Sequence, residues 1–227
     1  MRRLIEGYQH FAHDLFPERR DHFKLLSDRQ SPRWLFITCS DSRVVPDLIL
    51  QTEPGDLFIA RNAGNVVPAE SHGSDDGVAA TIEYAVEVLK VKHIILCGHS
   101  DCGALKAALD HVALEQLPKA RLWLSHVQDA FKYKQPLNSA DGPQAELASL
   151  IRGNVVAQLR NLRTQPSVLH ALSENRLQLH GWYYDILSGR VERYDEGAQK
   201  FSSVVNGSSS DALEAQGDVL GKHLTNL

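Results

Sequence analysis

Short uninterrupted apolar runs alternate along the chain with segments whose apolar residues recur three and four positions apart. The first pattern is typical of buried strands, and the second marks one face of a helix. We therefore predict strands at residues 34–38, 57–60, 93–97, 177–186 and 191–194. Helices are predicted at residues 4–16, from Pro46 onward for a short distance, and at 78–89, 103–109, 144–162 and 167–174.

The order of these elements predicts an α/β fold. Strands that alternate with helices favour a central, mostly parallel β-sheet flanked by helices. A turn at residues 187–190 joins the last two strands, so we expect an antiparallel edge hairpin there, and the first helix is expected to form an N-terminal helical arm. The 227 residues, 43% of them apolar, predict a single domain at 1–205, followed by a C-terminal tail at 206–227 that begins with a low-complexity run.

The composition of the chain limits which kinds of partner and which cellular compartment we expect. The 24 Lys and Arg against 28 Asp and Glu give a net charge of −4, which argues against a nucleic-acid partner. No stretch approaches the roughly 18 apolar residues of a membrane span, and the charged start at residues 1–7 lacks a signal-peptide core. We therefore expect a cytoplasmic protein without a membrane partner, in which clustered cysteines favour metal binding over disulfides. Cys97, alone inside a strand, is expected to be a core residue.

Metal-ligand residue types directly follow two of the predicted strands. Cys39 comes after the strand at 34–38, and His99 and Cys102 come after the strand at 93–97. Because the carboxyl ends of parallel strands open onto one crevice, we expect the three side chains to converge. Two thiolates and one imidazole suit zinc, and three protein ligands leave a fourth position for a reactive water. Ser100 or Asp101 is expected to cap the helix at 103–109, which places Cys102 near its positive end.

Asp41 and Arg43 lie two and four residues beyond Cys39, close enough to share the crevice. Arg43 can hold the Asp41 carboxylate in a two-pronged contact and leave one oxygen to accept a proton from a zinc-bound water. Two other interpretations stay open: an ordinary salt bridge, and a closed structural zinc site with Asp41 as the fourth ligand. A redox pair is disfavoured because Cys39 and Cys102 form no Cys-x-x-Cys motif, and the ten remaining histidines receive no role.

Four motifs in this order resemble those of the β-class carbonic anhydrases, in particular the bacterial and plant-like branch. They are Cys39-Ser40-Asp41-Ser42-Arg43, Arg61-Asn62-Ala63-Gly64-Asn65, Glu83-Tyr84-Ala85-Val86 and Gly98-His99-Ser100-Asp101-Cys102-Gly103. The resemblance runs over residues 11–194. It implies a carbonate dehydratase that reversibly hydrates carbon dioxide to bicarbonate and a proton through a zinc-bound hydroxide. It also implies one zinc ion per subunit on Cys39, His99 and Cys102, with Asp41 and Arg43 as the catalytic dyad.

The resemblance further implies a small apolar pocket, which suits carbon dioxide and spans two subunits of a homo-oligomer built from dimers. In it, Gln30 would donate a hydrogen bond to the substrate and the Gly103 amide would lie beside the substrate. Phe58, Ala63 and Tyr84 would line the walls. Ala63 replaces a valine that is frequent in the family, a change too small to alter the substrate class. Whether dimers assemble further into tetramers or octamers stays open.

One departure from the family bears on regulation. Some members hold an inhibitory bicarbonate with a tryptophan, an arginine and a tyrosine; the tryptophan position is Phe36 here, whereas Arg61 and Tyr184 match the other two. Without the indole donor, we predict an open zinc site and no strong inhibition by bicarbonate. Two other functions stay open: hydrolysis of carbon disulfide or carbonyl sulfide on the same zinc site, and a non-catalytic, zinc-stabilised binding protein.

Overall fold

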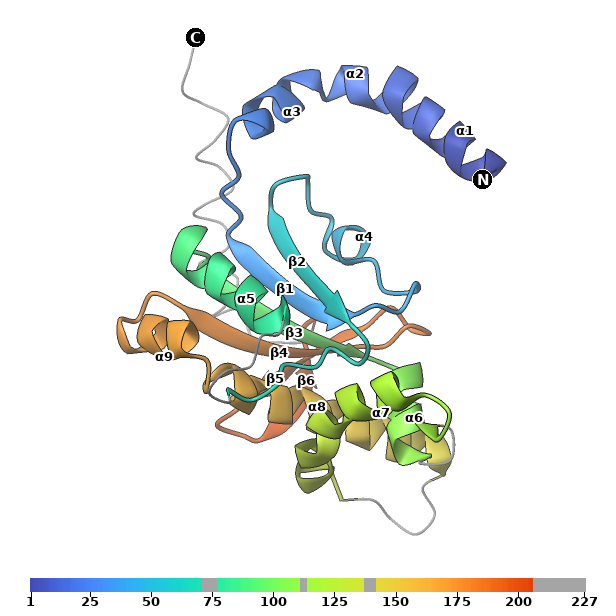
Figure 1. Cartoon of the computed structure of the whole chain (residues 1–227), viewed down its shortest axis with the longest axis vertical. Helices are drawn as coiled ribbons and strands as arrows, with labels where there is room; N and C mark the ends of the chain where they lie inside the picture. The colour runs from blue at the N-terminus through green and yellow to red at the C-terminus, as the bar shows by residue number, and fades with distance from the viewer. Residues whose placement is uncertain (71–76, 111–113, 137–141, 206–227) are drawn as a thin grey trace.

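A six-stranded sheet forms the centre of the structure, a computed structural model that describes residues 1–70, 77–110, 114–136 and 142–205 (Figure 1). The strand order is β2-β1-β3-β4-β5-β6. The strands are β1 (Trp34–Cys39), β2 (Leu57–Asn62), β3 (His93–His99), β4 (Gln178–Tyr184), β5 (Val191–Asp195) and β6 (Lys200–Ser203). The first four are parallel, whereas β5 and β6 pair antiparallel at one edge. The predicted mostly parallel sheet with an antiparallel edge hairpin is therefore confirmed, and β6 was not foreseen because it contains only one apolar residue.

The helices divide into an N-terminal arm and a set that packs on the sheet or on one another. The arm consists of α1 (Arg2–His10), a π-helical turn η1 (Phe11–Leu15), α2 (Phe16–Glu18) and α3 (Arg20–Ser27). The others are α4 (Pro46–Leu50), α5 (Gly77–Glu83) with its π-helical continuation η2 (Tyr84–Val88), α6 (Gly103–Leu109), α7 (Pro118–Leu124), the 3-10 helix η4 (Ser125–Tyr133), α8 (Pro143–Leu162) and α9 (Pro166–Ser173). Of these, α3, α7 and η4 were not predicted. The predicted C-terminal tail lies outside the described residues.

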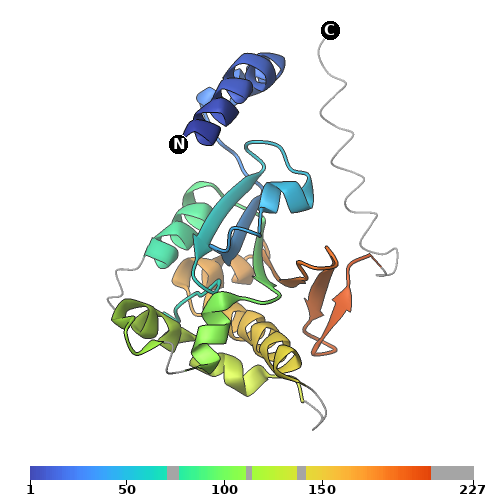
Figure 2. The same ribbon diagram turned by 90° about the vertical axis from the view of Figure 1, so that its right-hand side faces the viewer.

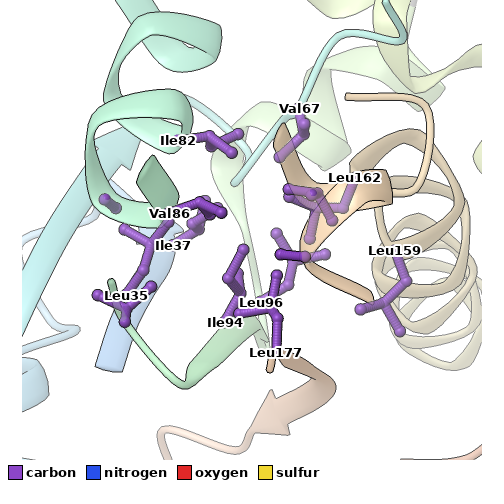
Figure 3. Packing of buried hydrophobic residues seen from close by; sticks show 14 of the residues in the cluster. Leu35, Ile37, Val67, Ile82, Val86, Ile94, Leu96, Leu159, Leu162 and Leu177 are labelled. Atoms are coloured by element: carbon purple, nitrogen blue, oxygen red, sulfur yellow. The ribbon is translucent and has the colours of Figure 1, made fainter. Parts of the chain in front are cut away.

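The main core lies between the sheet and the helices α5, α8 and α9 (Figure 3). Alternate residues of β1 and β3 face these helices and are fully buried, namely Leu35, Ile37, Ile94 and Leu96. The intervening residues Phe36, Ile95 and Cys97 form a second cluster on the opposite face. Burial raises the pKa of Cys97 to about 12, so this cysteine is an unreactive core residue, as its sequence position predicted.

The N-terminal arm extends away from the sheet (Figure 2). Its described contacts with the body are near the turn before β2, where Arg19 pairs with Glu53 and the His22 ring donates a hydrogen bond to the Pro54 carbonyl over 2.9 Å. Large apolar side chains of the arm remain exposed, including Leu4 at 71% and Leu25 at 74%. The arm therefore presents an apolar surface that the described residues do not cover.

Helix α8 passes very close to η4 at Gly153. A methyl group on Gly153 would lie 2.5 Å from the Ala130 carbonyl oxygen and 3.0 Å from the Tyr133 carbonyl carbon, both of them backbone atoms. Backbone yields less readily than the end of a side chain. The absence of a side chain at residue 153 therefore sets the spacing between α8 and η4.

We expect Gly153→Ala to lower the free energy of unfolding by about 1–2 kcal/mol, because overpacking outweighs the better helix propensity of alanine. Gly7→Ala is the matched control, since Gly7 is also helical and nothing lies within 4 Å of an added methyl group. Thermal and urea unfolding at one fixed protein concentration would compare the two variants with the wild type. A Gly153→Ala variant as stable as Gly7→Ala would show that the helix packing is looser than described.

Candidate metal centre and active site

Cys39, His99 and Cys102 converge at the carboxyl edge of the parallel sheet. Cys39 ends β1, His99 ends β3, and Cys102 immediately precedes α6. Their ligand atoms all lie within 4.8 Å of one another, and the two sulfur atoms are 3.9 Å apart. All three residues are buried, with exposed fractions of 5% or less. The convergence expected from the two strand ends is therefore present.

The predicted cap of helix α6 is wrong in its residue. Cys102 itself is the N-cap, and neither Ser100 nor Asp101 occupies that position. The Ser100 hydroxyl instead accepts a hydrogen bond from the Ile186 amide over 2.9 Å, and the Asp101 carboxylate turns toward Arg43. The Cys102 sulfur still lies at the start of the helix, but the neighbouring Cys39 and burial outweigh the helix amides and raise its pKa.

The donor set fits a soft divalent cation. Nδ1 of His99 donates to the Ser100 carbonyl over 2.9 Å, which fixes the tautomer. Nε2 is then an acceptor, and it is buried without a hydrogen-bond partner among the described residues. A buried acceptor without a hydrogen-bond partner lowers the stability of the fold. Nε2 of His99 lies close to the two cysteine sulfur atoms, which is the arrangement of a metal ligand. These three side chains could hold zinc.

The two cysteines do not ionise independently. Hydrogen bonds from the Cys102 thiol and from the Gly64 amide lower the pKa of Cys39 despite burial. The Gly64 nitrogen lies 3.4 Å from the Cys39 sulfur. The neighbouring Cys39 thiolate and burial raise the pKa of Cys102. The pair therefore shares one proton, which a bound cation would displace.

Asp41 and Arg43 form a two-pronged ion pair beside the cysteines and histidine. Nε and Nη2 of Arg43 donate to the two Asp41 carboxylate oxygens over 3.0 and 2.8 Å, and the Arg43 backbone amide adds a third bond of 3.0 Å. The Arg43 guanidinium holds the pKa of Asp41 well below its usual range. One Asp41 oxygen lies 3.8 Å from Nε2 of His99, so the carboxylate borders the candidate metal position while Arg43 engages it.

Asp101 and Arg61, which are not part of the Asp41–Arg43 pair, connect the ends of neighbouring strands. Arg43 also donates to the Asp101 carbonyl and carboxylate over 3.0 and 3.2 Å, and so bridges the loops after β1 and β3. Arg61 of β2 donates to the carbonyls of Cys39 and Asp41 over 3.0 and 2.7 Å. Asp101 has a left-handed backbone (φ 53°), a conformation that aspartate tolerates better than most residues. Nothing in the local sequence marked these contacts, because they join separate loops.

The residues expected to line the substrate pocket fall into two groups. Gly103 directly follows Cys102, and Ala63 precedes the Gly64 amide that contacts Cys39, so both lie beside the metal-ligand cluster. Phe58 pairs with Leu35 in the sheet, four residues from the level of Cys39 and about 13 Å along the strand.

Tyr84 lies with Phe58, since their ring centroids are 6.0 Å apart, and it is 44% exposed. Gln30 is exposed and precedes β1, at the end of that strand opposite to Cys39. The structure therefore does not bring Gln30, Phe58 and Tyr84 to the metal-ligand cluster of their own chain.

Comparison with known protein families gives a match over most of the sheet. A family model described as carbonic anhydrase matches residues 34–191. A carbonic anhydrase of Pseudomonas aeruginosa is 49% identical over 207 residues, which cover 90% of this chain and 92% of that protein. Carbonic anhydrase 1 of Escherichia coli O157:H7 is 46% identical over 202 residues, covering 88% and 91%.

Solved structures agree with the sequence comparison. The β-carbonic anhydrase CcaA superposes with a TM-score of 0.84 at 42% identity and covers 89% of this chain and 91% of its own. A tetrameric β-carbonic anhydrase from the filamentous ascomycete Sordaria macrospora superposes with a TM-score of 0.67 at 31% identity, covering 85% and 95%.

Proposed function

This chain belongs to the β-class carbonic anhydrases, and we propose that one zinc ion per subunit, held by Cys39, His99 and Cys102, serves its reaction. That reaction is the reversible hydration of carbon dioxide to bicarbonate and a proton. The observation that carries the proposal is the convergence of two thiols and an orphaned imidazole nitrogen in one buried cluster. The family relationship and the donor chemistry both favour zinc.

When bound, zinc supplies a Lewis acid that lowers the pKa of a coordinated water toward 7. Asp41 is proposed to orient the attacking water by accepting its hydrogen bond on the carboxylate oxygen nearest to His99. Arg43 keeps that carboxylate ionised and restrains it from moving onto the metal as a fourth protein ligand. This role of Arg43 argues against a closed, purely structural zinc site.

The walls of the substrate pocket are proposed to come from two subunits. Ala63 and the Gly103 amide would belong to the chain that binds the zinc, whereas Gln30, Phe58 and Tyr84 would come from its neighbour. Their separation from the metal-ligand cluster of their own chain, together with the exposure of Tyr84, supports this division. Apolar walls suit carbon dioxide, which is small and has no net dipole.

We propose a homo-oligomer built from dimers, in which the N-terminal arm of one subunit packs on the next. The exposed apolar residues Leu4, Tyr8 and Leu25 give the arm a surface that a neighbour would cover. A tetrameric relative of the same fold supports assembly beyond one chain.

Within the described part of the chain, no helix has the length and apolarity needed to cross a membrane. The proposed compartment is the cytoplasm, where the free cysteines would remain reduced.

Cys39→Ser and Asp41→Asn should separate metal binding from catalysis. We expect Cys39→Ser to lose most of its zinc, because a serine hydroxyl does not ionise near neutral pH to replace the thiolate. Asp41→Asn should keep its zinc but hydrate carbon dioxide about 100-fold more slowly, because an amide has one oxygen where the carboxylate has two and cannot both hold the two bonds from Arg43 and orient the water. Zinc is measured by atomic emission, and hydration by stopped-flow with a pH indicator.

Asp129→Asn is the matched control for Asp41→Asn, since Asp129 pairs with Lys132 on the exposed surface. It should keep both zinc and rate. Loss of zinc in Asp41→Asn would instead make Asp41 a metal ligand. A wild-type protein with full zinc and no hydration would contradict the proposed zinc chemistry and direct the next assay to carbon disulfide.

Bicarbonate should not inhibit this enzyme cooperatively. Phe36 lacks the indole donor of the inhibited family members, and Arg61 is already bonded to the Cys39 and Asp41 carbonyls. We expect the rate to depend on bicarbonate concentration along a simple hyperbola between pH 7 and 9. A sigmoidal profile would refute the open site predicted from Phe36.

Two inactive variants should restore activity when combined, if the pocket spans two subunits. Cys39→Ser keeps the pocket residues but not the zinc, whereas Gln30→Leu keeps the zinc but not the expected substrate donor. Co-expressed with different tags, they should yield about a quarter of wild-type activity, because half of the randomly paired dimers are mixed and each mixed dimer has one complete site of two. No recovery in isolated mixed dimers would assign Gln30 to the site of its own chain.

A further inference from the structure

The Gly64 amide donates a hydrogen bond to the Cys39 sulfur over 3.4 Å. Gly64 has a left-handed backbone (φ 84°), and a methyl group there would approach Leu105 to 3.1 Å. The direction in which the Gly64 N–H points therefore depends on the contacts that fix the two peptide groups on either side of its α-carbon. Both groups are anchored by side chains from distant helices.

Trp123 of α7 anchors the first of these peptide groups. Its indole Nε1–H donates to the Ala63 carbonyl over 2.8 Å. That carbonyl and the Gly64 N–H belong to the same peptide group, so the indole bonds one end while the other end donates to Cys39. A hydrogen bond to the carbonyl oxygen polarises the amide and strengthens its donation. The chain of contacts runs from the indole through the peptide to the sulfur.

Asn154 of α8 anchors the second peptide group. Its Nδ2 donates to the Gly64 carbonyl over 3.0 Å, and its Oδ1 accepts from Gln158 over 3.0 Å. Gln158 in turn accepts from the Val67 amide over 2.8 Å. Both amide side chains are fully buried in a helix whose neighbours are largely apolar. Buried amides cost stability unless they are bonded, and these bonds fix the loop that carries Gly64.

We propose that Trp123 and Asn154 are positioning residues that aim the Gly64 amide at the Cys39 sulfur and thereby limit the electron density that this thiolate gives to the metal. The inference rests on the proposed function in one respect, namely that Cys39 is a metal ligand. A hydrogen bond to a thiolate lowers the energy of the sulfur electrons, so it tunes the metal centre without touching substrate. A purely structural role, packing α7 on the loop, would change stability but not the sulfur electrons.

Trp123→Phe tests this in the full-length protein loaded with cobalt in place of zinc. The variant keeps an aromatic ring but removes the N–H donor, so the thiolate-to-cobalt charge-transfer absorption should move to longer wavelength. Trp182→Phe is the matched control: the Trp182 indole nitrogen is buried and has no hydrogen-bond partner in the described structure, so the absorption should not move.

Asn154→Ala provides a second variant, which releases the Gly64 carbonyl and should move the absorption in the same direction. Thermal unfolding of each variant reports packing separately. The inference is overturned if Trp123→Phe or Asn154→Ala folds and leaves the absorption at its wild-type position, or if Trp182→Phe moves it equally. Failure of the underlying function looks different: the thiolate absorption would then be absent from the wild type, or unaltered by Cys39→Ser.

Discussion

The parallel pairing of β1 with β3 is the constraint on which the whole site depends. Thr38 lies opposite Cys97, and its hydroxyl bonds the Cys97 carbonyl at 2.9 Å. Cys39 and His99 therefore leave the sheet at neighbouring positions of one edge. A slip of one residue would shift the two strand ends by about 3.3 Å and turn the apolar set of one strand away from the core. The buried apolar residues that fix this register also place the chemistry.

The charged groups around the cluster work in two layers. The inner layer holds the paired cysteines and the His99 nitrogen that lacks a hydrogen-bond partner. The negative charge of this set favours binding of a cation. In the outer layer, Arg43 engages Asp41 and Asp101, and so joins the loops after β1 and β3. The Arg43 guanidinium holds the Asp41 carboxylate beside the metal position and restrains it from binding the metal. The open coordination that the proposed reaction needs would follow from this arrangement.

The sequence predicted the parts of the molecule that depend on the local pattern of apolar and polar residues. Apolar runs predicted the strands, and the residues directly after them predicted that Cys39, His99 and Cys102 would converge. The cap of α6 was mistaken because Ser100 and Asp101 are bonded to residues far along the chain.

Contacts between separate loops and helices had no such signal. The hydrogen bond from Trp123 to Ala63 joins residues 60 positions apart, and no motif near either residue predicts it. The strand β6 was missed because one apolar residue among polar ones makes no run, and its pairing depends on β5. Long-range hydrogen bonds therefore account for most of what the sequence could not reveal.

A crystal structure of the zinc-loaded protein, with anomalous scattering recorded across the zinc absorption edge, tests the central claim most directly. The account predicts one anomalous peak per subunit, bonded to the sulfur atoms of Cys39 and Cys102 and to Nε2 of His99, with an oxygen from outside the protein in fourth place. Asp41 should still pair with Arg43. An Asp41 carboxylate bonded to the zinc, or zinc bound elsewhere, would contradict the account.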